Sequence, residues 1–341
     1  IQTDRLTCIP CFSREENYAQ NILSLVKEKK PDIIHIQHEY GIYGFTPTFF
    51  DFLEGTRKTG IKTVVTMHKV HTIPADKDEI EKTYGMENLE KNHRKLGELT
   101  DKIIVHSDVM KKQLIDYGVE EEKVVVIPHG TKIITKIDPS KAKEKFGFSG
   151  NNLIIMSFGF IRKFKNERLL IEALPDILKK VPNTRLLLIG TLHPYSSKDD
   201  IKEAGLRKDL VVDLELGKYV RFVEKWFPDE ELETVFSAAD TVVFLHDQQF
   251  LEVSGALHLG MGAGKPIVAT RVPRFKEVEV VTPETTFNVG EKDRFIEIII
   301  KLLTDKNFRE DVSKRIKAYA EKTCWEKIAE KHLEVYRNLL T

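Results

Sequence analysis

A group of cations follows one predicted strand of the chain. The apolar run 153–158 is followed by Gly159 and then, within a few residues, by Arg162, Lys163 and Lys165. Gly159 has no side chain, so a ligand can approach the backbone there closely, and lysine and arginine are the side chains that bind phosphate most strongly. These residues predict a phosphate site at the end of this strand. A solvated loop before a helix is the alternative interpretation.

A helix start later in the chain is the second element suited to a phosphate. Its residues are Ser254, Gly255, Ala256 and Leu257. Free N–H groups and the positive end of the helix dipole attract an anion there, and Gly255 leaves room for it. The segment GMGAGKP that follows is similar to a Walker A loop, but Leu259 and Pro266 stand where that motif needs a glycine and a hydroxyl. The helix start and the cationic loop together indicate a diphosphate site of another kind.

Short apolar runs rich in β-branched residues alternate with longer amphipathic segments along the chain. This alternation predicts parallel sheets that are covered by helices on both faces. The predicted strands span residues 33–36, 63–66, 102–106, 123–127, 153–158, 185–190, 219–222, 241–245 and 267–270. Ligands bind such sheets at the carboxyl ends of the strands, which is where both predicted phosphate elements lie.

A polar stretch at residues 131–150 separates two series of strands and helices. We therefore expect an α/β protein with two doubly wound Rossmann-like domains, residues 1–135 and 136–322, facing each other across a cleft. The first series has fewer strands, so this domain is expected to lack its first strand or strands. Residues 323–341 predict a C-terminal helix that packs back toward the first domain. Its apolar stripe consists of Trp325, Ala329, Leu333, Tyr336 and Leu340.

The composition excludes several classes of protein. The 341 residues include 53 basic and 53 acidic side chains, and a net charge of zero argues against a nucleic-acid binder. No apolar run approaches the roughly 20 residues that cross a bilayer, and peripheral contact with a membrane is left open. Three cysteines cannot all pair within one chain and indicate a reduced, cytoplasmic protein. Cys8 and Cys11 have C-x-x-C spacing but no second ligand pair, so no zinc or dithiol site is expected.

Several segments, in order, resemble the family 4 retaining glycosyltransferases of GT-B architecture. They are HEYGIYG (38–44), VVTMHKVH (64–71), IPHGT (127–131), SFGFIRKFKN (157–166), IGTLHP (189–194), FSAADTVVF (236–244), SGALHLGMGAGKPIVAT (254–270) and CWEKIAEKHLEVY (324–336). The most similar form is a branch with an SG-x-L signature in place of the family's Glu-x7-Glu motif. The resemblance covers nearly the whole chain and implies the fold and the reaction class, but not the sugar.

The resemblance implies roles for the residues that could act in the reaction. Lys165 matches the lysine that neutralises the donor diphosphate. The partner arginine of the family would fall at Phe160, so Arg162 is expected to replace it. His68 matches a histidine that lies near the donor sugar and stabilises the reacting centre. A histidine that merely caps a strand is the alternative for His68.

The resemblance also implies that other residues contact the donor sugar than in most of the family. Leu251 and Leu259 occupy the positions of the two motif glutamates, so Gln249 and Glu252 are expected to hold the sugar instead. The other donor-side residues are His129 and Gly130, at a hinge near the phosphates, and His193, which shapes the nucleotide pocket or forms a plain turn. The acceptor-side residues are His38, Glu39 and Gly41, at the end of a first-domain strand.

We expect an enzyme that needs neither a metal nor another cofactor. It would transfer a hexose from a nucleotide-diphosphate sugar to a sugar, glycan or lipid-linked acceptor, with retention of the anomeric configuration. Asp76 and Asp78 have the D-x-D spacing that binds metal in other glycosyltransferases, but they are expected on a solvated face. The alternatives are a nucleotide-sugar epimerase of similar fold and a non-catalytic nucleotide-sugar-binding protein with a degenerate site.

Overall fold

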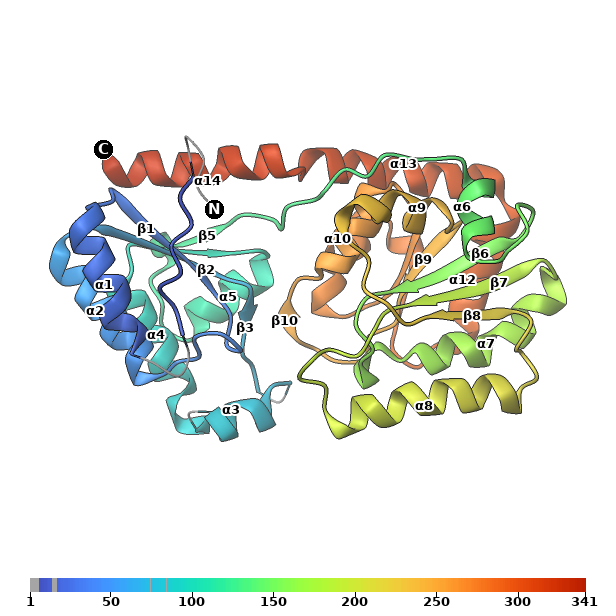
Figure 1. Cartoon of the computed structure of the whole chain (residues 1–341), viewed down its shortest axis with the longest axis horizontal. Coiled ribbons are helices and arrows are strands. Elements are labelled where there is room, and N and C mark those ends of the chain that lie inside the picture. The colour runs from blue at the N-terminus through green and yellow to red at the C-terminus, as the bar shows by residue number, and fades with distance from the viewer. Residues whose placement is uncertain (1–5, 14–16, 74, 84) are drawn as a thin grey trace. The chain divides into compact units, whose positions relative to one another are not determined.

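The computed structural model of the chain describes residues 6–13, 17–73, 75–83 and 85–341, and these residues form two compact units (Figure 1). Unit 1 contains the described residues of Ile1–Pro128, Phe250–Val253 and Ile328–Thr341. Unit 2 contains His129–Gln249 and Ser254–Lys327. Each unit is built around a parallel sheet with its own apolar core.

Unit 1 has a four-stranded parallel sheet in the order β1-β2-β4-β5. Its strands are β1 (Ile33–His38), β2 (Lys62–Met67), β4 (Lys102–Val105) and β5 (Val124–Val126). The helices that connect or precede them are α1 (Tyr18–Lys29), α2 (Pro47–Thr59), α3 (Lys77–Thr83), α4 (Leu89–Leu99) and α5 (Asp108–Asp116). Each right-handed crossover moves the chain in the same direction along the sheet, so α2, α4 and α5 lie on one face, where they share an apolar core.

The opposite face of this sheet is covered by the C-terminal helix α14 (Trp325–Leu340). The residues that pack together there are Ile328 and Val335 of the helix and Val64, Ile104 and Ile127 of the sheet. The predicted apolar stripe of this helix is therefore wrong, and four of its members are exposed: Trp325, Ala329, Leu333 and Leu340. The buried stripe lies one residue earlier along the helix, which is about 100° around its axis.

A two-stranded antiparallel sheet in unit 1 joins segments that are distant in the sequence. Strand β3 (Lys69–Val70) pairs with β10 (Leu251–Glu252), which places Glu252 opposite Lys69. Strands of two residues, such as these and β12 (Thr286–Phe287), were not predicted because two residues show no period. All the longer strands were predicted, and their ends lie within two residues of the predicted ends.

Unit 2 has a six-stranded parallel sheet in the order β12-β11-β9-β6-β7-β8. The remaining strands of this sheet are β6 (Leu153–Phe158), β7 (Thr184–Ile189), β8 (Val220–Val223), β9 (Thr241–Phe244) and β11 (Ile267–Thr270). The chain builds one half of the sheet outward from β6 to β8 and then returns to the other side of β6 with β9. The winding direction reverses between β6 and β9, and at such a point open α/β sheets bind their ligands.

The helices of unit 2 cover both faces of its sheet (Figure 1). They are α6 (Pro139–Lys145), α7 (Glu167–Lys180), α8 (Lys198–Asp213), α9 (Leu232–Ser237), α10 (Gly255–Gly262), α11 (Lys276–Val281), α12 (Lys292–Thr304) and α13 (Lys306–Lys322). Right-handed crossovers place α7 and α8 on one face and α10 and α11 on the other, while α12 contacts α7 and α13 contacts α10. The two parallel, Rossmann-like sheets with alternating helices confirm the predicted fold class, although only the sheet of unit 2 is doubly wound.

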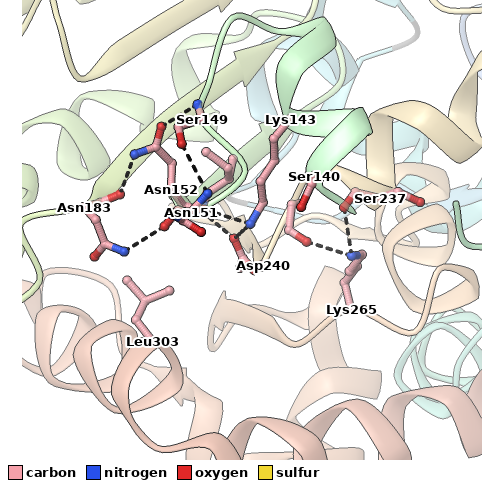
Figure 2. Close-up of polar contacts among 12 residues, drawn as sticks. Ser140, Lys143, Ser149, Asn151, Asn152, Asn183, Ser237, Asp240, Lys265 and Leu303 are labelled. Carbon is pink, nitrogen blue, oxygen red and sulfur yellow. Dashed lines mark hydrogen bonds and ion pairs between the residues drawn. The ribbon is translucent and has the colours of Figure 1, made fainter. Parts of the chain in front are cut away.

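Polar side chains close the edge of the unit 2 sheet at which its strands begin (Figure 2). Lys143 of α6 pairs with Asp240 at 2.8 Å and donates to the Asn152 carbonyl at 2.7 Å. Asp240 also accepts a hydrogen bond from the backbone of β6, and Lys265 donates to the Ala239 carbonyl at 2.7 Å. We call Lys143, Asn152, Asp240 and Lys265 the amino-end group. These bonds tie α6, β6, β9 and β11 together.

Candidate functional site

Lys165 lies in the short 3₁₀ turn η3 (Lys163–Lys165), just beyond the carboxyl end of β6. Its ammonium donates a hydrogen bond to the Phe158 carbonyl at 2.9 Å. Burial lowers the pKa of Lys165 to about 8, the Glu167 carboxylate opposes this shift, and three arginines, Arg274 foremost, add to it. Lys165 is therefore charged at neutral pH. A bound anion would offset both the cost of burying this charge and its repulsion by the arginines.

Gly159 is the point at which Lys165 and helix α10 come together. Its backbone φ of +109° is a conformation that favours glycine. A Cβ atom at Gly159 would lie 2.9 Å from Lys165 Nζ and 3.6 Å from the Cβ of Ala256. The ammonium and the first turn of α10 thus flank the same glycine. The structure therefore gathers these three predicted residues at the carboxyl end of β6.

Helix α10 begins at the predicted position. Ser254 is its N-cap and accepts a hydrogen bond from the Leu257 N–H at 3.2 Å. The N–H groups of Gly255 and Ala256 have no acceptor within the helix, and a Cβ at Gly255 would meet no atom within 4 Å. The helix start presents backbone donors and the positive end of its dipole to open space near Lys165, an arrangement that suits an anion.

The other cations of the loop, and Arg168 of α7, are held by carboxylates of α8. The pairs are Arg162 with Asp200 at 2.9 Å, Lys163 with Asp199 at 2.8 Å, and Arg168 with Glu203 at 2.8 Å. A capping box between Ser197 and Asp200 fixes the start of α8 and so the position of these carboxylates. Arg162, which was expected to replace the family arginine, already has a carboxylate partner, whereas Lys165 contacts a carbonyl oxygen.

A buried ion pair fixes α7 to α8 next to this loop. Glu167, the first residue of α7, accepts a hydrogen bond from the Ser157 hydroxyl at 2.5 Å and pairs with Arg207 of α8. All three side chains are buried. The pair was not predicted, because nothing in the sequence shows that residues 40 positions apart meet. It supports the turn that carries Lys165.

Two residues that were not predicted lie at the neighbouring strand ends. His246 follows β9 and is buried against the rings of Phe164 and Phe275, at centroid distances of 5.2 and 4.7 Å. Arg274 follows β11, and its guanidinium lies 5.9 Å from the Phe164 centroid. Burial, with the charges of Arg274 and Lys165, holds the pKa of His246 well below its ordinary value, so this imidazole is neutral. Positive charge therefore surrounds a neutral ring beyond the ends of β9 and β11.

An aromatic group follows β6, β7 and β8. Phe160 contacts His193 and Trp226, with ring centroids 4.9 and 6.0 Å apart. Trp226 is 70% exposed and Tyr195, beside His193, is 86% exposed. His193, predicted to shape a nucleotide pocket or form a turn, is therefore part of an exposed aromatic surface. Phe160, at the position of the family arginine, is part of the same surface.

The remaining predicted donor-side residues lie elsewhere. His129 stacks on His258 of α10 with ring centroids 4.6 Å apart, and the Trp325 ring fills the space that a Cβ of Gly130 would need. These contacts pack the start of unit 2 against α10 and the first turn of α14. Gln249 is exposed, and Glu252 belongs to strand β10 of unit 1.

A row of hydrogen-bonded side chains crosses the carboxyl edge of the unit 1 sheet. His68, just after β2, contacts Gln37 Oε1 through Nε2 at 2.8 Å and His106 Nε2 through Nδ1 at 3.1 Å. His106, just after β4, contacts the Ile127 carbonyl through Nδ1 at 3.0 Å. Burial lowers the pKa of His68. Both ring nitrogens of the histidine predicted to be catalytic are therefore engaged within unit 1.

The predicted acceptor-side residues lie at the end of β1 and in the turn that follows it. His38 is fully buried among aromatic rings, and burial lowers its pKa to about 4. Its side chain was expected to face the acceptor and instead lies in the core, because successive strand residues point to opposite faces and Gln37 takes the exposed position. The Glu39 carbonyl accepts from the Ile42 N–H at 2.9 Å, and Gly41 has open space around it.

The D-x-D pair is split between two environments. Asp76, expected on a solvated face, is buried and pairs with Lys69 at 2.6 Å, whereas Asp78 is exposed. Across the part of the chain that the structure describes, no three His, Cys, Asp or Glu side chains are placed to hold a metal ion. In the same residues, every helix is too short or too polar to cross a membrane.

Comparison with known proteins gives family matches over both units. Residues 138–319 match the family model described as Glycosyl transferases group 1, and residues 10–133 match Glycosyltransferase Family 4. The D-inositol 3-phosphate glycosyltransferase of Acidothermus cellulolyticus is 26% identical over 250 residues, which are 70% of this chain and 54% of that protein. The enzyme of the same name from Kineococcus radiotolerans is 27% identical over 266 residues, 70% of this chain and 58% of that protein. The chain spans little more than half the length of these relatives.

Solved structures share the fold. The crystal structure of Anabaena Alr3699/HepE in complex with UDP has a TM-score of 0.74 and 19% identity, covering 94% of this chain and 82% of that chain. A glycosyltransferase from Rickettsia africae has a TM-score of 0.73 and 19% identity, covering 95% of this chain and 80% of that chain. At such identities the likeness establishes the architecture alone.

Proposed function

We propose that this chain, which belongs to the glycosyl transferases of group 1, transfers a hexose from a UDP-sugar to an acceptor hydroxyl, with retention of configuration and without a metal. One observation carries the proposal. The Lys165 ammonium and the first turn of α10 flank Gly159 at the carboxyl end of β6, next to the point where the winding of the sheet reverses. A diphosphate is the donor group that such an arrangement suits best.

The chemistry follows from the charge that the leaving group develops. When the bond between the sugar and the diphosphate breaks, negative charge grows on the phosphate oxygens. A fixed ammonium and fixed N–H groups stabilise this charge without having to reorganise, an effect typically worth several kcal/mol. Lys165 and the amides of Gly255 and Ala256 take this role. The α8 carboxylates leave Lys165 as the loop cation without a carboxylate contact within the residues described.

The nucleoside would extend from the diphosphate toward β7 and β8. The aromatic group of Phe160, His193 and Trp226 lies past the ends of these strands, and exposed rings stack well on nucleobases. We take the base to be uracil, because a solved structure of similar fold holds UDP. The reaction is assigned to the cytoplasm on the sequence argument that three cysteines cannot all pair within one chain.

The acceptor is assigned to unit 1. His68 and Gln37 form the polar carboxyl edge of its sheet, and the acceptor is a sugar, a glycan or a lipid-linked sugar. The names of the curated relatives give D-inositol 3-phosphate as an acceptor in those proteins, so phosphorylated cyclitols join the acceptors to test. In the proposed reaction the leaving phosphate takes the proton of the acceptor hydroxyl.

The test begins with a panel of nucleoside diphosphates and nucleotide sugars scored by thermal shift, since a ligand that binds the native state raises the melting temperature. UDP and a UDP-hexose are expected to give the largest shifts. Transfer to an acceptor panel is then followed by UDP release, and the anomeric configuration of the product is read by NMR. An epimerised donor without acceptor would show an epimerase. Binding without turnover would show a non-catalytic protein, and no binding of any nucleotide sugar would overturn the proposal.

A further inference from the structure

The hydrogen bonds around His106 determine which of its ring nitrogens carries hydrogen. The Ile127 carbonyl can only accept, so His106 Nδ1, at 3.0 Å, must donate. In a neutral imidazole the other nitrogen is then an acceptor. His106 is buried, at 7% exposure, and burial disfavours a charged ring. His106 Nε2 therefore accepts a hydrogen bond.

The tautomer of His68 follows from that of His106. His68 Nδ1 lies 3.1 Å from His106 Nε2, and because the latter accepts, His68 Nδ1 must donate. The remaining nitrogen of a neutral His68, Nε2, then has a lone pair and is an acceptor. Burial lowers the pKa of His68 below the ordinary value of 6.5, which favours this neutral form. The Ile127 carbonyl thus determines the tautomer of His68 through His106.

The partner of this lone pair is Gln37, which is exposed. With its amide NH2 turned toward His68, Gln37 donates to Nε2 across the 2.8 Å contact, since the two ends of an amide are interchangeable in such a contact. A donor from a ligand can replace an exposed amide without opening the core. His68 Nε2 is accordingly an acceptor that is occupied by an exchangeable side chain.

Other titratable groups surround the row. His35 Nε2 of β1 lies 3.3 Å from the other end of the Gln37 amide, which is its oxygen once the NH2 is turned toward His68, and 2.7 Å from the Thr66 hydroxyl. Tyr336 and His332 of α14 contact the ring of His35. Burial, followed by the charges of His332 and His68, lowers the pKa of His35 to about 4. Burial likewise lowers the pKa of His38 to about 4, so His35 and His38 remain neutral above about pH 5.

We propose that His106 is a positioning residue that makes His68 Nε2 a hydrogen-bond acceptor for a sugar hydroxyl, which takes the place of the Gln37 amide. This inference rests on the proposed function, because it assigns the hydroxyl to a substrate of that reaction. Tautomer control through a second side chain is also how an aspartate orients the histidine of a serine hydrolase. Here a backbone carbonyl and a second imidazole supply it.

The test compares three variants. His106→Leu removes the link and is expected to lower kcat roughly tenfold to a hundredfold, as for other groups that orient a ligand or base. His106→Gln is expected to restore most of kcat, because an amide can both accept from His68 and donate to Ile127. His93→Leu is the matched control. His93 is likewise buried and contacts a carbonyl, that of Leu89, through Nδ1 at 2.7 Å. This control is expected to lose stability and keep kcat.

Two further readouts separate positioning from structural support. The ¹⁵N spectrum of the wild-type protein is expected to show a protonated Nδ1 and an unprotonated Nε2 for His68, and a mixture of tautomers in His106→Leu. The kcat of the wild type should fall as the pH is lowered, with an apparent pKa below 6.5. The same fall is expected in His106→Gln. A wild-type His68 with hydrogen on Nε2 would overturn the inference, whether or not any variant folds poorly.

The source of the hydroxyl is read from KM. KM is measured for deoxy analogues of the donor sugar and of the acceptor, in the wild type and in His106→Leu. The analogue whose KM is the same in the two proteins lacks the hydroxyl that His68 binds. Equal sensitivity of all analogues would contradict the inference. If the wild type binds no nucleotide sugar and transfers nothing, the proposed function fails, whereas the ¹⁵N assignment still decides the tautomer of His68.

Discussion

The two edges of the unit 2 sheet both contain a lysine whose pKa burial lowers to about 8, yet their surroundings differ. At the amino edge, Lys143 pairs with Asp240, and Lys265 donates to carbonyl oxygens (Figure 2). At the carboxyl edge, α10 has N–H groups without helical acceptors, and His246 Nδ1 is buried with no hydrogen-bond partner in the described residues. The polar groups of the amino edge have partners within the protein and stabilise the fold. The carboxyl edge retains polar groups without such partners, which a ligand can use.

The largest expected effect comes from exchanging one lysine at each edge. Lys165→Met is expected to lower transfer by about 10²–10³-fold, as when one preorganised donor to the developing charge is removed. Lys265→Met, at the other edge, should leave kcat within about twofold, because that ammonium is far along the strands from the diphosphate site. Initial rates of UDP release measure both. Equal losses of transfer rate in the two variants would contradict the proposed difference between the two edges.

The amino edge should dominate stability. Asp240→Ala leaves Lys143 buried without its carboxylate, and removing one partner of a buried ion pair costs about 3 kcal/mol. Urea unfolding of the variant measures this loss, with kcat per folded molecule as the control that should stay unchanged. A variant as stable as the wild type would show that the amino-end group is not a stabilising element.

The charge on Lys165 predicts how anion binding depends on pH. The ammonium is protonated below its pKa of about 8 and neutral above it, so the affinity for UDP should fall by up to about tenfold per pH unit above that value, until the higher pKa of the bound lysine is reached. Lys165→Arg should remove this fall, because arginine stays protonated, and Lys265→Arg should not. Calorimetry between pH 7 and 10 distinguishes them, and an unchanged wild-type affinity would rule out a role for this ammonium.

The smallest expected effect is a gain in stability. His246→Phe replaces a buried polar ring with an apolar one that suits the contacts to Phe164 and Phe275. Removing an unpartnered buried nitrogen should stabilise the fold by about 1 kcal/mol, visible as a higher melting temperature. A lower melting temperature would show that the imidazole has a structural partner.

The sequence predicted the residues that follow directly from strand ends. Gly159, Lys165 and Ser254 lie where the alternation of strands and helices places them, because the position of a strand end depends on the local pattern alone. The resemblance to family 4 glycosyltransferases is confirmed by the family matches. The assignments of Arg162 and His68 stay predictions, now with Asp200 and His106 as their partners.

The features that were missed depend on contacts between distant segments. The α8 carboxylates, His106 and His246 belong to no motif, and their partners are set by the packing of helices and strands. The buried stripe of α14 was misassigned because the helix has apolar residues on more than one side. His38 was expected at the acceptor because a strand end was located without deciding which of its last residues, Gln37 or His38, faces outward.

The most direct test of a diphosphate site at Gly159 is a crystal structure of the protein with UDP. The phosphate oxygens are predicted to lie within about 3.2 Å of Lys165 Nζ and of the N–H groups of Gly255 or Ala256. A diphosphate bound away from the carboxyl end of β6, with Lys165 still on the Phe158 carbonyl, would contradict this assignment.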